Sequence, residues 1–144
     1  MTKIDFYLLA GAGPNAREAM ACKLIDKVYQ LHHQVYVHTE SQQDAQRLDD
    51  LLWTFRPGSF IPHSISSSKT TPDTPIVIGF QDNTPEINDV MLNLTHEVPL
   101  FFSQFNRVAE LVDADENARS QARNRFKFYK DRGYELDTHD MTSR

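Results

Sequence analysis

Short apolar segments alternate with helix-spaced segments along this chain of 144 residues. The segments at residues 4–9, 34–39 and 76–80 are rich in β-branched and aromatic residues and end at turn residues, which is typical of strands. Between the first two, apolar residues recur at helical spacing from Ala19 to Tyr29. Strands separated by helices predict an α/β fold with a mostly parallel sheet and helices on both faces. We expect one domain over residues 1–144.

Turn and cap residues place the remaining elements. Pro14 fits the first turn of a helix because its missing N–H would have no partner there. Ser41 is positioned to cap a second helix that runs through Leu52. Residues 55–75 are rich in proline and serine, which predicts a long loop of the kind that often has a function. Further strands are expected at 88–94 and 107–112, a short helix at 100–105, and a final helix after Asp115.

Charge and composition exclude several classes of protein. The formal net charge of −5 argues against a protein that coats DNA through a broad positive surface. Cys22 is the only cysteine, so no internal disulfide is possible. No apolar run approaches the roughly 20 residues of a membrane span, and the first residues read as a strand rather than a signal peptide. We therefore expect a cytoplasmic protein with no membrane contact.

Residues 119–133 form a basic segment in this acidic chain. They hold six of the fifteen Lys and Arg residues and one acid, Asp131. On a helix, four of these cations share one stripe within about 80° of arc, beside the ring of Phe126: Arg119, Arg123, Lys127 and Lys130. A solvated helix face is the alternative, but such faces usually carry interspersed acids. The segment therefore predicts an anionic partner that binds at one place.

Large apolar residues also gather between residues 51 and 63, around Trp53 and Phe60. Two interpretations remain open for this stretch. The loop can fold back onto the core, or it can present a surface to a partner protein, since tryptophan and other aromatics dominate the centres of such surfaces.

Gly11, Gly13 and Ala16 match the dinucleotide-binding pattern G-x-G-x-x-A after a strand, and Glu40 follows the next strand. A small NAD(P)-binding enzyme is therefore an alternative function. However, Pro14 removes one N–H from the phosphate-binding turn, and Glu40 lies further along the chain than the usual spacing of about 20 residues. No second domain supplies a substrate site. We expect no cofactor.

Other catalytic patterns are missing from the sequence. The six histidines lack metal-ligand spacing with cysteine or acids. Neither a G-x-S-x-G motif nor a phosphate-binding Walker loop occurs. Cys22 lies on the apolar face of the first helix, where a core role is expected. We predict no catalytic residue and no metal.

The chain resembles the chi subunit family of bacterial DNA polymerase III over essentially its whole length. The likeness is carried by residues 6–9, by 47–53 and 59–63, and by 122–129 and 133–136. The resemblance implies a Rossmann-like, noncatalytic adaptor of the clamp-loader complex. One face of such an adaptor binds the psi subunit, and another binds the acidic C-terminal tail of single-stranded DNA-binding protein. DNA is then reached only indirectly.

The resemblance also assigns residues to these two faces. It implies a psi site, shared with an accessory helicase, at Trp53, Phe60, Pro62 and His63. It implies a tail site at Val112, Arg123, Phe126 and Lys127, and the flanking Arg119 would add positive charge to this site. Two departures stand out: the family often has tyrosine where this chain has Phe126, and residues 137–144 lack the aromatic ending of many relatives.

The proposed tail site agrees with elementary chemistry. An acidic tail that ends in an aromatic residue needs a cation for its carboxylate and an apolar slot for its ring. Arg123 supplies bidentate carboxylate binding, and Phe126 with Val112 supplies apolar contact. Direct binding of single-stranded DNA through Arg125, Phe128 and the basic stripe is a second alternative, which the net acidity of the chain disfavours.

Overall fold

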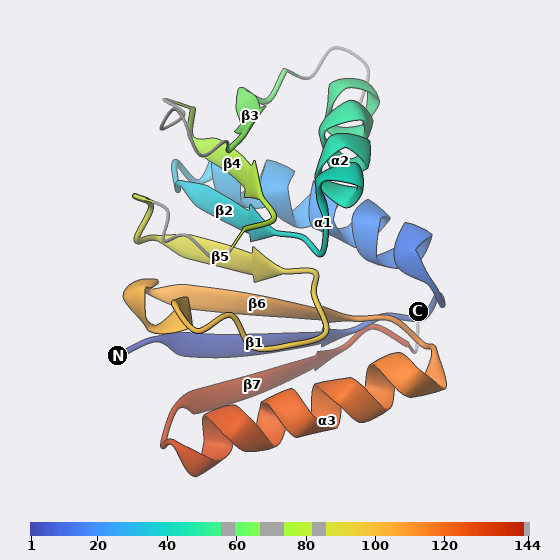
Figure 1. Ribbon diagram of the computed structural model, residues 1–144, viewed down its shortest axis with the longest axis vertical. Coiled ribbons are helices and arrows are strands. Elements are labelled where there is room, and N and C mark those ends of the chain that lie inside the picture. Colours follow the sequence, from blue (N-terminus) through green and yellow to red (C-terminus); the bar gives the residue numbers. More distant parts are fainter. Residues whose placement is uncertain (56–59, 67–73, 82–85, 143–144) are drawn as a thin grey trace.

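The computed structural model describes residues 1–55, 60–66, 74–81 and 86–142 (Figure 1). Its strands are β1 (Lys3–Leu8), β2 (Val35–His38), β3 (His63–Ile65), β4 (Ile76–Gly79), β5 (Val90–Asn93), β6 (Arg107–Val112) and β7 (Glu135–Asp140). Its helices are α1 (Pro14–Gln30), α2 (Gln42–Thr54) and α3 (Glu116–Asp131), with a short 3-10 helix, η1 (Phe102–Gln104).

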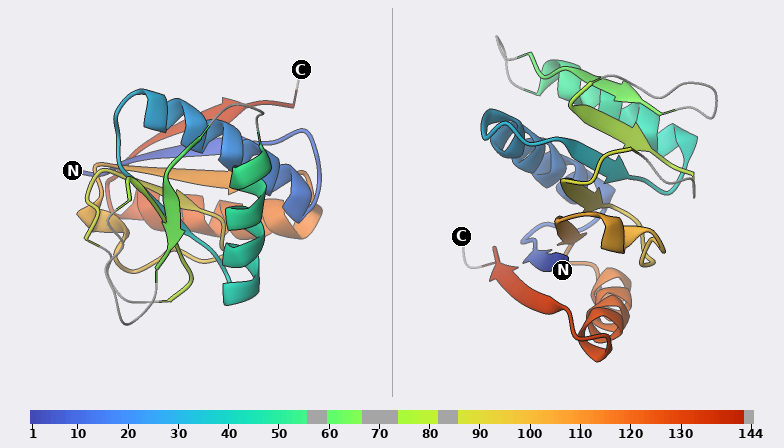
Figure 2. Two further views of the ribbon diagram at one scale, coloured as in Figure 1. Left: turned by 90° about the horizontal axis from the view of Figure 1, so that it is seen from above. Right: turned by 90° about the vertical axis from the view of Figure 1, so that its left-hand side faces the viewer.

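Within the described residues, the strands form one sheet in the order β3-β4-β2-β5-β6-β1-β7. Every neighbouring pair of strands is parallel. α1 and α2 cover one face of this sheet and α3 covers the other, as the views in Figures 1 and 2 show. The expected α/β fold, a parallel sheet with helices on both faces, is confirmed.

The alternation of side chains along the strands separates two core layers. In β2, Val35 and Val37 pack with α1 and α2, whereas Tyr36 packs on the side of α3. The same alternation holds in β4 and β5. Because both faces are covered, these central strands are apolar at almost every position, as buried parallel strands are.

The predicted helix starts are confirmed. Pro14 is the first residue of α1, and the preceding Gly13 has φ 88°, in the left-handed region that favours glycine. Ser41 caps α2, because its side chain accepts a hydrogen bond from the N–H of Asp44 at 3.2 Å. Asp115 caps α3 in the same way, accepting from the N–H of Ala118 at 3.2 Å.

The long loop predicted over residues 55–75 is partly wrong, because it contains β3. This strand of three residues pairs with β4 at one edge of the sheet. Its sequence, His-Ser-Ile, has a single β-branched apolar residue, which is too little to predict a strand. The short helix expected at 100–105 is present as η1.

The expected order of elements ended with the basic helix, whereas the structure has one more strand. β7 pairs with β1 along its whole length and forms the other edge of the sheet. The N–H of Met141 then donates to the carbonyl of Leu8 at 2.9 Å. The sequence Glu-Leu-Asp-Thr-His-Asp lacks the apolar alternation of a half-buried strand, and charged residues are typical of edge strands.

Candidate protein-interaction surfaces

The solvent-facing side of α3 carries the predicted basic stripe. Arg123, Lys127 and Lys130 are exposed, while Ala122 and Tyr129 on the opposite side of the helix are buried against the sheet. Lys127 forms an exposed ion pair with Asp131 at 3.0 Å. The guanidinium of Arg123 has no hydrogen bond or ion pair with any residue that the structure describes. Arg123 is thus available to bind an anion.

Two other residues predicted for the tail site are bound within the protein. Arg119 donates from Nε to the carbonyl of Asp113 and from Nη2 to the carbonyl of Leu9, both at 3.0 Å. It therefore holds the start of α3 to the carboxyl ends of β1 and β6. Val112 is 1% exposed and belongs to the core below α3.

Phe126 lies at the border between the basic stripe and this core. Its ring is half-buried and is centred 5.3 Å from the ring of Phe6. One side of the ring therefore supports the packing of α3, and the remaining area is open beside Arg123. The structure brings Arg123, Phe126 and Lys127 together on one surface, which we call the basic surface.

Arg125 follows Arg123 by two residues but has a different environment. Its side chain is 5% exposed, and its Nε donates to Oε1 of Glu110 at 3.0 Å. Nη1 donates to the carbonyl of His96 at 3.0 Å. A guanidinium held in this way is not accessible to a nucleic acid, so the alternative of direct DNA binding loses one of its cations.

Glu110 is the centre of a buried polar cluster that the sequence analysis missed. Besides Arg125, it accepts a hydrogen bond from the hydroxyl of Tyr129 at 2.6 Å and two from Nδ2 of Asn93. Burial and the nearby Glu110 carboxylate raise the pKa of Tyr129, so its hydroxyl stays a donor. The available signal was an acid inside the apolar strand at 107–112. Such an acid needs a buried partner.

The end of α2 and the residues before β3 form a second surface. Trp53 is 51% exposed and Phe60 is 64% exposed, and their ring centroids lie 5.5 Å apart. Side chains of this size are rarely left in water as a pair in a folded domain. We call this pair, with the half-buried Pro62 beside it, the aromatic surface. The exposure of both rings favours a surface for a partner over a loop folded back onto the core.

His63, which was also predicted for this surface, lies beneath it. Its side chain is fully buried, and its ring centroid is 4.4 Å from that of Trp53. The ring contacts oxygen atoms of Ile61 and Asp49. His63 therefore supports the aromatic surface from below and does not present its ring to solvent.

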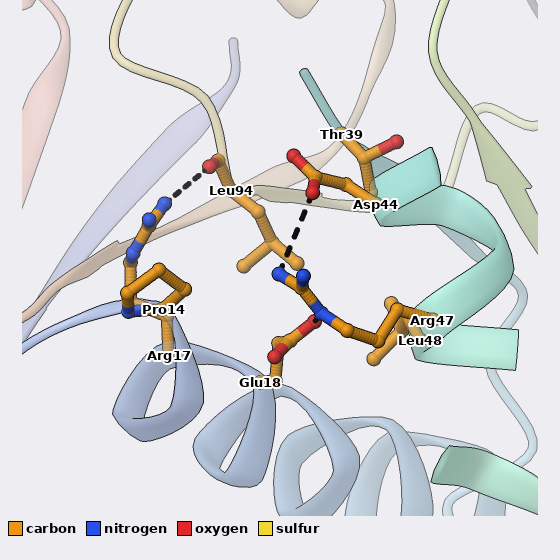
Figure 3. A pocket seen from close by; sticks show the side chains of 8 residues that line it. All are labelled: Pro14, Arg17, Glu18, Thr39, Asp44, Arg47, Leu48 and Leu94. Atoms are coloured by element: carbon orange, nitrogen blue, oxygen red, sulfur yellow. Dashed lines mark hydrogen bonds and ion pairs between the residues drawn. The ribbon is translucent and has the colours of Figure 1, made fainter. Parts of the chain in front are cut away.

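A small pocket of about 70 Å³ opens between α1 and α2, at the carboxyl edge of the sheet (Figure 3). Its two arginines are both bound to neighbours. Arg47 pairs with Glu18 at 2.8 Å, and Arg17 donates to the carbonyl of Leu94 at 2.6 Å. Ligand pockets are usually about 300–1,000 Å³, so this space is too small for a dinucleotide.

The glycine-rich turn that precedes α1 lies at the same edge of the sheet. Glu40, the expected ribose ligand, instead accepts a hydrogen bond from the N–H of His96 at 2.8 Å. Burial and the Glu18 carboxylate raise the pKa of the Cys22 thiol to about 11, so Cys22 is not an activated nucleophile. Neither feature favours an enzyme site.

Clusters of three or more His, Cys, Asp or Glu side chains able to hold a metal ion are absent from the part of the chain that the structure describes. None of the helices in the described ranges has the length and apolarity that a bilayer span requires.

Comparison with known proteins identifies the family of the chain. Residues 1–137 match the family described as DNA polymerase III chi subunit, HolC. The chain belongs to the chi subunit family of DNA polymerase III. It is therefore a member of a family of replication accessory subunits.

Curated relatives cover nearly the whole chain. A Pseudomonas aeruginosa protein named DNA polymerase III subunit chi is 39% identical over 141 residues, which are 98% of this chain and 98% of the relative. The Haemophilus influenzae and Escherichia coli proteins of the same name are 30% and 27% identical, over 95% and 96% of this chain and 96% and 97% of their own lengths.

A solved structure of T4 UvsW has a similar fold. The TM-score is 0.71, the sequence identity is 11%, and the match covers 97% of this chain and 41% of the other. At this identity the likeness concerns the fold alone.

Proposed function

We propose that this chi-family chain is a noncatalytic adaptor of the DNA polymerase III clamp-loader complex, acting in the cytoplasm as one domain of residues 1–144. The aromatic surface binds the psi subunit, and an accessory helicase uses the same surface. The basic surface binds the acidic C-terminal tail of single-stranded DNA-binding protein. DNA is reached only through that protein.

The observation that carries this proposal is the exposed guanidinium of Arg123, which pairs with no described residue and lies beside the half-buried ring of Phe126. The guanidinium can bind a carboxylate, and the ring can pack against an aromatic side chain. Lys127 adds positive charge next to both. A peptide with acidic residues and a terminal aromatic residue matches this combination better than a uniform polyanion such as DNA.

The position of the two surfaces supports an adaptor. α2 lies on one face of the sheet, near the β3 edge, and α3 lies on the other face, near the β7 edge (Figure 2). Partners of ordinary size can therefore occupy both surfaces without touching each other.

A capture experiment tests the basic surface. The immobilised chain should capture full-length single-stranded DNA-binding protein and should lose this capture when the C-terminal tail of that protein is removed. Undiminished capture of the truncated protein counts against the proposal.

Phe60→Ala is expected to weaken the complex with psi by about 2 kcal/mol or more, because truncation of an aromatic residue at the centre of an interface has this effect. The free chain should keep its folding stability, since 64% of Phe60 is exposed. Calorimetric titration with psi and thermal unfolding of the free chain measure the two effects.

Leu100→Ala is a matched control for this change, because Leu100 is an exposed apolar residue outside the aromatic surface. It should leave psi binding unchanged. Unfolding of the free Phe60→Ala chain would show instead that Phe60 belongs to the core.

The chain is expected to bind neither NAD nor NADP at physiological concentration. Glu40 is engaged by the backbone of His96, and the nearby pocket is small. Titration followed by the fluorescence of Trp53, the one tryptophan in the chain, provides the measurement. Micromolar affinity that is abolished by a bulky residue at Gly13 would restore the enzyme alternative.

A further inference from the structure

The strand β7 forms one edge of the sheet, and its outer side pairs with no strand that the structure describes (Figure 1). It has six residues, and each of them has a partner in β1. Proline and bulges, which commonly prevent an edge strand from pairing further, are both missing from β7. This edge is therefore long and regular enough to pair with another strand.

The direction of the backbone groups of β7 follows from one hydrogen bond. The N–H of Met141 donates to the carbonyl of Leu8 at 2.9 Å. Because backbone groups alternate in direction along a strand, the residues two, four and six positions before Met141 also point to β1. The N–H and C=O groups of Leu136, Thr138 and Asp140 then point away from the sheet. These outward groups have no hydrogen-bond partner among the described residues.

The side chains of β7 form two different rows. His139 stacks on Tyr7, which packs on the side of α1. Glu135 and Asp137 share this row by alternation, and their side chains are 72% and 52% exposed. In the other row, Leu136 packs against the core beneath α3. The side chains of an added strand would continue both rows, because residues opposite each other on neighbouring strands share a face.

The charge of this edge indicates the chemistry of the added strand. Half of the six residues of β7 are acidic, and none is lysine or arginine. Among the described residues, Lys3 is the one cation that pairs with Glu135 and Asp137, at 3.5 and 2.7 Å. Exposed ion pairs of this kind contribute little, so both acids can still attract further cations. A strand with lysine or arginine in this row therefore pairs more favourably than β7 of a second copy, which would bring further acids.

We propose that the outer edge of β7 is a docking site for an extended segment of a partner protein in which lysine or arginine alternates with apolar residues. The segment pairs with the outward backbone groups of β7, as in other complexes where a peptide adds a strand to a sheet. Its cations lie beside Glu135 and Asp137, and its apolar side chains lie beside Leu136. This inference does not depend on the proposed function, because none of these residues belongs to the basic surface or the aromatic surface.

Hydrogen exchange of the full chain, followed by ¹⁵N NMR, tests this site with a capped peptide of alternating lysine and valine that is as long as β7. In the free chain, the outward amides of Leu136 and Thr138 should exchange faster than those of Asp137 and His139, which face β1. The peptide should slow the exchange of both outward amides. A peptide with the same lysines and valines in two separate blocks should bind about fivefold more weakly, because it cannot place every lysine in the acidic row.

Thr138→Pro separates strand addition from simple attraction between charges. The N–H of Thr138 points away from β1, and proline is tolerated at edge positions whose N–H faces solvent, so the chain should still fold. The change removes a donor to the added strand and places the proline ring between the two strands. Binding of the alternating peptide should therefore fall about tenfold or more. Thr138→Val is the matched control, because it keeps the N–H, and it should bind the peptide like the wild-type chain.

Three results would overturn the proposal. Equal binding of the two peptides, or undiminished binding by a folded Thr138→Pro chain, would refute strand addition at β7. If Thr138→Pro does not fold, the wild-type chain decides, and exchange rates of Leu136 and Thr138 that the alternating peptide leaves unchanged would refute the site. A dimer of the free chain that Thr138→Pro dissociates would show that a second copy, and not a basic segment, occupies this edge.

Discussion

Arg123→Glu is expected to abolish most of the binding of a peptide that copies the acidic C-terminus of single-stranded DNA-binding protein. The change removes a bidentate donor for a carboxylate and introduces repulsion. A charged contact that becomes desolvated in a complex costs about 2–5 kcal/mol when one partner is lost. Calorimetric titration at low salt measures the loss. The free chain should remain folded, because Arg123 is exposed and forms no hydrogen bond or ion pair with any described residue.

Arg132→Glu is the matched control for this prediction. It changes the net charge equally, but Arg132 lies about 180° around the helix from Arg123 and stacks on the ring of Phe128. It should weaken the peptide complex only through long-range electrostatics, which fade as the Debye length falls from about 10 Å at 0.1 M salt to about 3 Å at 1 M. Equal losses for both variants would place the peptide elsewhere.

Arg125→Met is expected to lower the free energy of unfolding by about 3–5 kcal/mol, the usual cost of removing one partner of a buried ion pair. Glu110 is fully buried, and without Arg125 the donors that remain to its carboxylate among the described residues are the neutral ones of Tyr129 and Asn93. Urea unfolding, followed by circular dichroism, measures the change.

Arg132→Met provides the reference for a surface arginine on the same helix. Its cation–π contact with Phe128 is exposed, so the expected loss is within about 1 kcal/mol. A change in Arg125→Met as small as that in Arg132→Met would mean that the buried cluster does not hold α3 on the sheet.

Arg123 and Arg125 show what sequence could and could not predict about the site. The helix period correctly placed Arg123 and Lys127 on one exposed stripe, because that result depends only on 3.6 residues per turn. The burial of Arg125 depends on Glu110, an acid from another element fifteen residues earlier. Pairing between elements requires the sheet order, which local spacing does not contain.

The same distinction applies to the fold. Central strands such as β2 and β4 were predictable because both faces of a parallel strand are buried and their sequences are apolar. The edge strands β3 and β7 were missed because each pairs on one side only and half of the residues of β7 are acidic. Caps such as Ser41 were predictable because they depend on neighbours within one turn.

The aromatic surface falls between these cases. Clustering of Trp53 and Phe60 in the sequence indicated a surface or a folded-back loop, and only their exposure in the structure favours the first. The buried position of His63 depends on the carbonyl of Asp49, fourteen residues away. No sequence pattern predicts such a contact with a backbone oxygen.

The most direct test of the adaptor is a calorimetric titration of the tail peptide into the preformed complex of this chain with psi. Because the basic and aromatic surfaces lie on opposite faces of the sheet, the peptide should bind the complex one to one, with the affinity that it has for the free chain. Displacement of psi, or loss of peptide binding in the complex, would show that the two partners share one surface and would contradict the adaptor.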